Sequence, residues 1–172
     1  DNFPISGIVL THSADAIITD SASSATAYST GSKTKNGFLG VDQEGRILEN
    51  LTEKLDNFGF VSALISTSEI THATPAAFSS HVDSRRNTDE ISSQMLESKV
   101  ATILGGGRKF FLSAENGGKR KDKRDLLEEA KKSHKILMHK HELEISGITP
   151  SDRILGLFAD EHLRDEENPD NH

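Results

Sequence analysis

The first group in this chain that could do chemistry is a serine that follows an aspartate where a helix should begin. Residues 18–27 read ITDSASSATA, and either Asp20 or Ser21 can cap a helix that runs to about Ser29 and ends at Gly31. Free backbone N–H groups and the helix dipole favour an anion at such a helix start. Taken alone, the spacing favours a serine-rich capped helix without a chemical role over a reactive serine.

A second cluster combines a histidine, a threonine and an arginine. Residues 69–78 read EITHATPAAF and follow the most apolar strand signal, which should place them at the carboxyl end of a sheet. Thr74 can cap a helix that starts at Pro75, and His72 lies two residues earlier, on the same side of an extended backbone. Arg85 follows, and its guanidinium can hold a phosphate through two parallel N–H bonds. Locally, the alternative is a helix start with an incidental histidine and a surface arginine.

Short apolar runs alternate with helical patterns along the chain. A helical face over 47–58 should carry apolar side chains and stop at Gly59, and further apolar stripes occur at 91–96 and 126–130. The run at 60–65 is nearly continuous, which predicts a strand covered on both faces. Alternation of this kind predicts an α/β fold with a mostly parallel central sheet and helices on both faces. Strands are expected at 7–10, 60–65, 100–104, 136–138 and 154–158.

Composition excludes several classes of protein. The chain has 172 residues, a net charge of −7 at pH 7 and no cysteine, so disulfide frameworks and thiolate zinc sites are excluded. Its acidity argues against nucleic-acid binding, and the basic stretch 108–124 is interpreted as a solvated surface turn because no aromatic residues interleave with its charges. We expect no transmembrane segment and find no signal peptide. The chain lacks an initiator methionine and ends in the acidic stretch 159–172, so we expect a piece of a longer protein, truncated at both ends.

Taken together, these segments resemble the alkaline phosphatases, which are zinc- and magnesium-dependent phosphomonoesterases. Residues 18–26 (ITDSASSAT) are similar to the nucleophile signature, 71–78 (THATPAAF) to the magnesium-site segment, and 81–86 (HVDSRR) to the segment with the phosphate-binding arginine. Residues 30–42 and the GGGR sequence at 105–108 also resemble the corresponding segments of the family. The resemblance is strong over 1–112 and weaker over 113–172. It implies that 1–172 forms part of a single alkaline-phosphatase-like catalytic domain, whose sheet is incomplete in this chain.

The resemblance implies a role for each site residue. Ser21 would be the nucleophile that becomes phosphoserine, and it would also contact zinc. Arg85 would grip two phosphate oxygens, and Asp20 would hold Arg85 in place. Thr74 would bind magnesium, with His72 in the same site as a ligand or beside one. The family uses two Zn²⁺ and one Mg²⁺, and an imidazole at position 72 would shift the preference of that site away from magnesium.

This chain departs from the family pattern in its metal ligands. The family needs further carboxylates and histidines, and none of the remaining residues is a convincing match. His139 and His141 could face one side of a strand and bind a metal, but two histidines alone make an incomplete zinc site. We therefore expect the isolated chain to hydrolyse phosphate esters poorly or not at all. The other histidines are interpreted as surface or packed residues: His12, His81, His134, His162 and His172.

The resemblance also implies substrates, partners and location. It implies phosphate monoesters and inorganic phosphate as ligands, periplasmic or secreted localisation, and it allows a homodimer. Two other functions stay open. One is a sulfatase- or phosphodiesterase-like metallohydrolase, against which the DSASSAT run at 20–26 argues. The other is a non-catalytic phosphate-binding relative, against which the retained Ser21, Thr74 and Arg85 argue.

Overall fold

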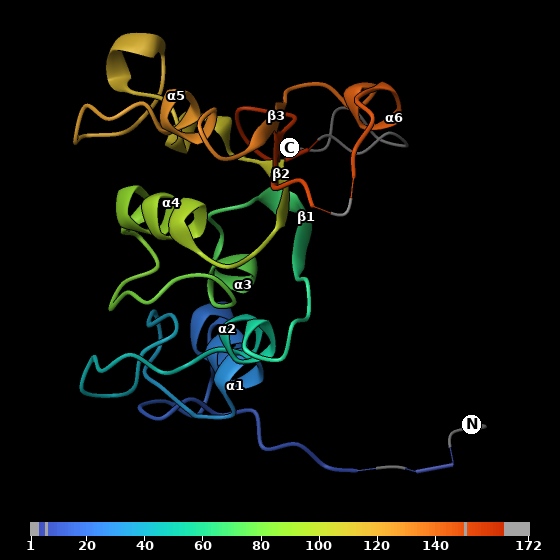
Figure 1. The fold of residues 1–172 in the computed structure, drawn as a ribbon. Helices are drawn as coiled ribbons and strands as arrows, with labels where there is room; N and C mark the ends of the chain where they lie inside the picture. Colours follow the sequence, from blue (N-terminus) through green and yellow to red (C-terminus); the bar gives the residue numbers. More distant parts are fainter. Residues whose placement is uncertain (1–3, 6, 150, 164–172) are drawn as a thin grey trace.

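The computed structural model describes residues 4–5, 7–149 and 151–163. Within them, strands form one parallel sheet in the order β1-β2-β4-β3 (Figure 1). This confirms the predicted α/β fold with a parallel sheet. The strands are β1 (Ala63–Glu69), β2 (Thr102–Gly106), β3 (Lys135–Leu137) and β4 (Ile154–Leu157). The helices are α1 (Ser21–Thr30), α2 (Leu51–Asp56), α3 (Ala73–Ala76), α4 (Thr88–Glu97), α5 (Leu126–Ala130) and α6 (Glu142–Ile145), with 3-10 turns at Arg108–Phe110 and Ala114–Asn116.

One face of the sheet packs into the main hydrophobic core. On this face, residues from the four strands lie side by side in register: Leu64 of β1, Ile103 of β2, Leu155 of β4 and Ile136 of β3. These side chains join a cluster with the apolar stripes of α4 and α5, which lie beside the sheet in Figure 1. The stripes predicted at 91–96 and 126–130 therefore have the role expected of them: they cover the sheet.

The opposite face is open at β1, contrary to the expectation for this strand. Ile65 points away from the core and is 73% exposed, although its register partner Leu104 is partly buried. In the described residues β1 pairs with β2 alone, so it is an edge strand. The prediction of a strand covered on both faces was wrong because apolar content does not say whether a neighbour is present to cover it.

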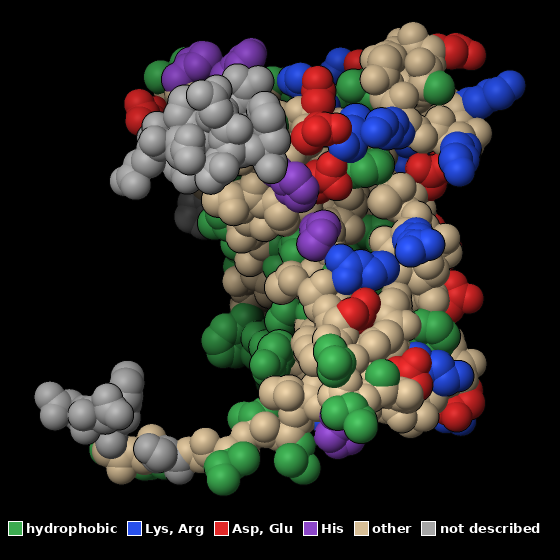
Figure 2. Space-filling view, turned by 180° about the vertical axis from the view of Figure 1, so that it is seen from behind, with side chains coloured by type: hydrophobic (Ala, Val, Ile, Leu, Met, Phe, Trp, Pro, Cys, Tyr) green, Lys and Arg blue, Asp and Glu red, His purple; other side chains and the backbone are tan. Residues whose placement is uncertain are grey.

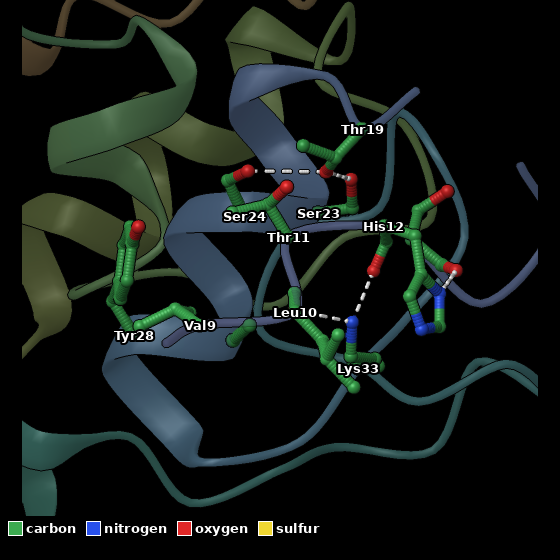
Figure 3. A pocket seen from close by; sticks show the side chains of 11 residues that line it. Val9, Leu10, Thr11, His12, Thr19, Ser23, Ser24, Tyr28 and Lys33 are labelled. Atoms are coloured by element: carbon green, nitrogen blue, oxygen red, sulfur yellow. Dashed lines mark hydrogen bonds between the residues drawn. The ribbon is translucent and has the colours of Figure 1, made fainter. Parts of the chain in front are cut away.

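The apolar run at 7–10 forms no strand. Ile8 is 97% exposed, and the backbone continues past the side of α1 as an extended segment. The Lys33 ammonium donates to the carbonyl oxygens of Leu10, at 2.8 Å, and His12 (Figure 3). A small pocket between this segment and α1 is lined by hydroxyl and apolar side chains. A lysine thus anchors a segment that pairs with no strand in the part of the chain that the structure describes.

The helix predicted over 47–58 is shorter than expected. Asn50 caps α2 by accepting from the Thr52 and Glu53 N–H groups, while Glu53 accepts from the Asn50 N–H, which completes a capping box. Ile47 instead lies in an isolated bridge with Val41 and is 71% exposed. The apolar periodicity was real, but the cap at Asn50 decides where the helix begins.

The basic stretch 108–124 is only partly a solvated turn. The Arg120 side chain is buried and donates to Ser92 Oγ at 2.5 Å and to the Phe110 carbonyl at 3.2 Å. It also pairs with Asp122. The surface interpretation was therefore wrong for Arg120, because its guanidinium donates to polar groups of α4 and of the 3-10 turn after β2. No helix among the described residues is long and apolar enough to cross a membrane.

Candidate active site

Asp20 fixes the start of α1, as predicted. Its backbone is extended, and its Oδ1 accepts the Ser23 N–H at 2.9 Å. Its Oδ2 accepts the Gly37 N–H at 3.1 Å. Burial raises the pKa of the Asp20 carboxyl, but the hydrogen bonds from Ser23, Gly37 and Arg85 outweigh burial and lower it. The helix ends at Gly31, whose φ of 76° suits a glycine C-cap.

Arg85 reaches this helix start from the loop before α4. Its Nη1 donates to Ser21 Oγ at 2.6 Å and to Asp20 Oδ2 at 3.3 Å. The Arg85 N–H donates to the Gly37 carbonyl at 2.7 Å, so both its backbone and its side chain are tied to the α1 region. Ser21 is exposed, and the Arg85 side chain is partly exposed. A hydroxyl, a guanidinium and the amide end of a helix therefore meet at one accessible point, which suits a phosphate group.

His72 lies beside Arg85. Arg85 Nη2 is 3.4 Å from His72 Nε2, a contact in which the guanidinium donates to a neutral imidazole. Burial, the Arg85 charge and the neighbouring His162 lower the pKa of His72, although the Glu69 carboxylate opposes this. A lowered pKa favours the neutral imidazole, in which a ring nitrogen can accept.

The helix start after β1 differs from the prediction. His72, rather than Thr74, occupies the N-cap position of α3, and Pro75 is the third helical residue instead of the first. Proline is tolerated there because the N–H groups of the first helical turn have no intrahelical partner. Thr74 therefore lies inside the first turn, exposed to solvent, and not in an extended segment with His72.

Metal ligands are too few in the described part of the chain. No group of three or more His, Asp or Glu side chains there could hold a metal ion. His139 and His141 stack with ring centroids 5.7 Å apart at 15°, in a turn after β3, without a third donor. Ser21, His72 and Thr74 alone do not fit a two-zinc, one-magnesium centre, so no step through a metal follows from this geometry.

The sequence interpretation missed a charged cluster beside His72. Lys109 Nζ lies 2.6 Å from Glu69 Oε1 and 2.8 Å from Glu161 Oε1. His162 Nδ1 accepts the Glu69 N–H at 3.0 Å, and its ring lies edge-on to His72 with centroids 6.0 Å apart. Figure 2 shows histidine, cationic and acidic side chains side by side on one face. Glu69 and Lys109 adjoin recognised motifs and could have been found, but nothing local indicates that residues 161–162 return to the site.

Comparison with known proteins agrees with this geometry. The alkaline phosphatase family model matches residues 1–172. Alkaline phosphatase 4 of Bacillus subtilis (strain 168) is 36% identical over 165 residues, covering 91% of this chain. The alkaline phosphatase of Thermus thermophilus superposes with a TM-score of 0.81 at 34% identity over 92% of this chain. That of the Antarctic bacterium TAB5 gives 0.78 at 34% over 91%.

These relatives are longer than this chain. The chain spans 33% of the Bacillus subtilis protein, 32% of the Thermus thermophilus chain and 44% of the TAB5 chain. A histidine-to-aspartate variant of the TAB5 enzyme has magnesium bound in its M3 site. The family model covers the site residues in the sequence, and the superposed structure matches the fold that carries them. On this evidence the chain belongs to the alkaline phosphatase family.

Proposed function

We propose that this chain carries the nucleophile and the phosphate-gripping groups of a phosphomonoesterase. The observation that carries the proposal is the 2.6 Å contact from Arg85 Nη1 to Ser21 Oγ at the N-terminus of α1. A guanidinium so close to the serine hydroxyl would neutralise phosphate oxygens at the position where that hydroxyl attacks.

The residues of this chain support a two-step transfer. Ser21 Oγ would attack phosphorus, forming a serine–phosphate bond while the bond to the ester oxygen breaks and the alcohol leaves with the serine proton. Water would then attack phosphorus, releasing inorganic phosphate and restoring the serine hydroxyl. Arg85 would stabilise the charge on the equatorial oxygens in both steps, and Asp20 would keep Arg85 in position.

Serine needs activation that the described residues do not provide. A serine hydroxyl is a weak nucleophile at its own pKa, and a zinc ion held beside Ser21 would supply the activation by lowering the pKa of that hydroxyl. We propose that two Zn²⁺ and one Mg²⁺ are required, with Ser21, His72 and Thr74 as the contacts from this chain. Magnesium in the M3 site of the TAB5 variant supports a magnesium site in the family, but that variant carries aspartate in place of a histidine, whereas this chain has His72. Because the described donors are too few, the isolated chain should show little turnover.

The natural setting follows from the same proposal. Phosphate monoesters and inorganic phosphate would be the ligands, and the complete protein would work in the periplasm or outside the cell. A homodimer is compatible with the family.

Hydrolysis of p-nitrophenyl phosphate at alkaline pH by the full-length protein would test the proposal. Ser21→Ala should lower metal-dependent turnover by roughly 10³-fold or more. Arg85→Ala should lower it by roughly 10²–10³-fold, as does loss of other donors to transition-state oxygens. Arg86→Ala is the matched control, since Arg86 is the exposed neighbouring arginine. Full turnover in Ser21→Ala would refute a serine nucleophile.

Two alternatives become outcomes of the same experiment. Preferential turnover of sulfate esters or phosphodiesters would indicate a sulfatase- or phosphodiesterase-like enzyme. Phosphate binding that depends on Arg85, without turnover of any ester while metals are bound, would indicate a non-catalytic relative. The shortage of metal ligands in the described residues is the observation that keeps this second alternative open.

A further inference from the structure

We propose that Lys109 is a positioning residue for the candidate site. Its ammonium links the carboxyl end of β1 to the segments that follow β2 and β4, and through Glu69 it fixes His72 beside Arg85. The inference rests on the proposed function for its consequences, but its geometry can be tested separately.

Lys109 is a buried cation between two carboxylates. The residue is only 9% exposed, and its Nζ contacts Glu69 Oε1 at 2.6 Å and Glu161 Oε1 at 2.8 Å. Burial alone would lower the pKa of Lys109, but the hydrogen bonds to both carboxylates raise it instead. A lysine is rarely buried unless its charge is paired, so the position is specific for a cation.

The backbone around Lys109 ties the same three segments together. The Ile70 N–H donates to the Gly106 carbonyl at 3.0 Å, and the Gly107 N–H donates to the Glu161 carbonyl at 2.9 Å. A Cβ at Gly106 would lie 1.9 Å from the Glu161 carbonyl oxygen, so only glycine allows this approach. Lys109 therefore extends from a loop that is already in contact with both neighbours.

The two carboxylates are not equivalent. The Glu69 side chain is 18% exposed, whereas that of Glu161 is 69% exposed. An ion pair is screened less by solvent where it is buried, so the contact with Glu69 should dominate. Glu69 is also the partner that is hydrogen-bonded to His72 of the candidate site.

Glu69 is connected directly to His72. The Glu69 carbonyl accepts the His72 N–H at 2.9 Å, and the Glu69 N–H donates to His162, whose ring lies against that of His72. His72 in turn contacts Arg85 at 3.4 Å. Without the Lys109 ammonium, the Glu69 carboxylate would be left without its buried partner and should turn toward water. The turn that holds His72 would then lose its anchor.

The experiment compares variants of the full-length protein by inorganic phosphate affinity and by the imidazole signals in ¹H–¹⁵N NMR spectra. Lys109→Met keeps the length of the side chain and removes the charge. It should weaken phosphate binding roughly tenfold, as loss of a supporting contact does at other sites, and shift the ring signals of His72 and His162. Lys109→Arg should restore most of both. Lys99→Met is the matched control, since Lys99 forms only an exposed pair with Asp56 at 3.9 Å.

The route through Glu69 is tested by two further variants. Glu69→Gln should reproduce the effect of Lys109→Met, while Glu161→Gln should change phosphate affinity less than about twofold, as expected for an exposed pair. The double variant of Lys109 and Glu69 should be no worse than either single one, because both remove the same contact. If Lys109→Met does not fold, Glu69→Gln and Lys109→Arg still decide the matter.

Unchanged phosphate affinity and unchanged imidazole signals in a folded Lys109→Met, or in Glu69→Gln, would overturn the inference. A larger effect of Glu161→Gln than of Glu69→Gln would overturn the proposed route. If the full-length parent protein binds no phosphate at all, the proposed function is refuted. The imidazole signals still report whether Lys109 positions His72.

Discussion

The two faces of the sheet differ in what covers them. On the covered face, Ile103 of β2 is completely buried beneath α4 and α5. On the open face, Ile65 of neighbouring β1 is 73% exposed and borders a hollow of about 350 Å³ whose wall includes Leu143 of α6 and Phe158. The side chains are chemically alike, and only their neighbours differ.

This difference separates what apolar side chains contribute to stability from what they make available for contact. Burial of an isoleucine side chain contributes about 1.5–3 kcal/mol, and an exposed one contributes almost nothing. The covered face should therefore hold the fold together, while the open face resembles the exposed apolar patches that mark contact surfaces.

Substitution of Ile103 should give the largest difference in stability between the two faces. Ile103→Ala should lower the free energy of unfolding by about 2–5 kcal/mol, because it leaves a cavity within the packed core. Ile65→Ala makes the same chemical change on the open face and should cost less than about 0.5 kcal/mol, as a surface substitution does. Urea denaturation of both variants measures the contrast. Equal losses would show that the open face is covered in solution.

A buried histidine makes the stability of the folded chain depend on pH. Burial, and then the charge of Arg153, lower the pKa of His134 to about 4, from an ordinary value of 6.5. The unfolded chain therefore takes up a proton that the folded chain refuses, and stability falls as the pH drops from about 6.5 toward 4. Between pH 7 and pH 5 this group alone should remove about 2 kcal/mol.

Replacement of His134 isolates that contribution. His134→Phe should flatten the fall in the free energy of unfolding between pH 7 and pH 5, as measured by urea denaturation at each pH. His139→Gln, at an exposed histidine, serves as the control. A parallel pH dependence in His134→Phe and the parent chain would show that His134 is accessible to protons in the folded state.

At the carboxyl end of β2, the segment around Glu161 covers the otherwise open face of the sheet. A methyl group at Gly106 would collide with the Glu161 carbonyl, so Gly106→Ala should cost about 1–3 kcal/mol through overpacking. Gly7→Ala, where an added Cβ meets nothing within 4 Å, should be almost neutral. Thermal denaturation of the two variants compares them. A neutral Gly106→Ala would mean that the segment around Glu161 is not seated on the sheet.

Local sequence signals predicted the elements that are marked by capping residues or by an apolar run. Asp20 and Gly31 bound α1 as expected, and the strand after α4 was found from its apolar run. The strand predicted at 7–10 and the covered outer face of β1 failed because both depend on neighbours that no local pattern reports. Burial and strand pairing are properties of distant contacts.

The site was predictable to a similar extent. The resemblance named five residues: Asp20, Ser21, His72, Thr74 and Arg85. Contacts of Arg85 join it to Asp20, Ser21 and His72, and Thr74 is not among these contacts. The resemblance gave no hint of Lys109, Glu161 or His162. Their importance arises from two loops meeting at the sheet edge, and His162 approaches Glu69 from 93 positions along the chain.

The smallest expected effect concerns the open face itself. Ile65→Thr keeps a β-branched side chain suited to a strand and removes apolar surface beside the hollow, so the free energy of unfolding should change by less than about 0.5 kcal/mol. Binding of the apolar dye ANS should nevertheless fall, because the dye needs the apolar wall that Ile65 provides. Ile17→Thr makes a similar change at a residue that is 92% exposed and does not line this hollow, and it should leave dye binding unchanged. If both variants lose dye binding equally, the dye reports exposed isoleucine in general, and the open face has no special capacity for apolar contact.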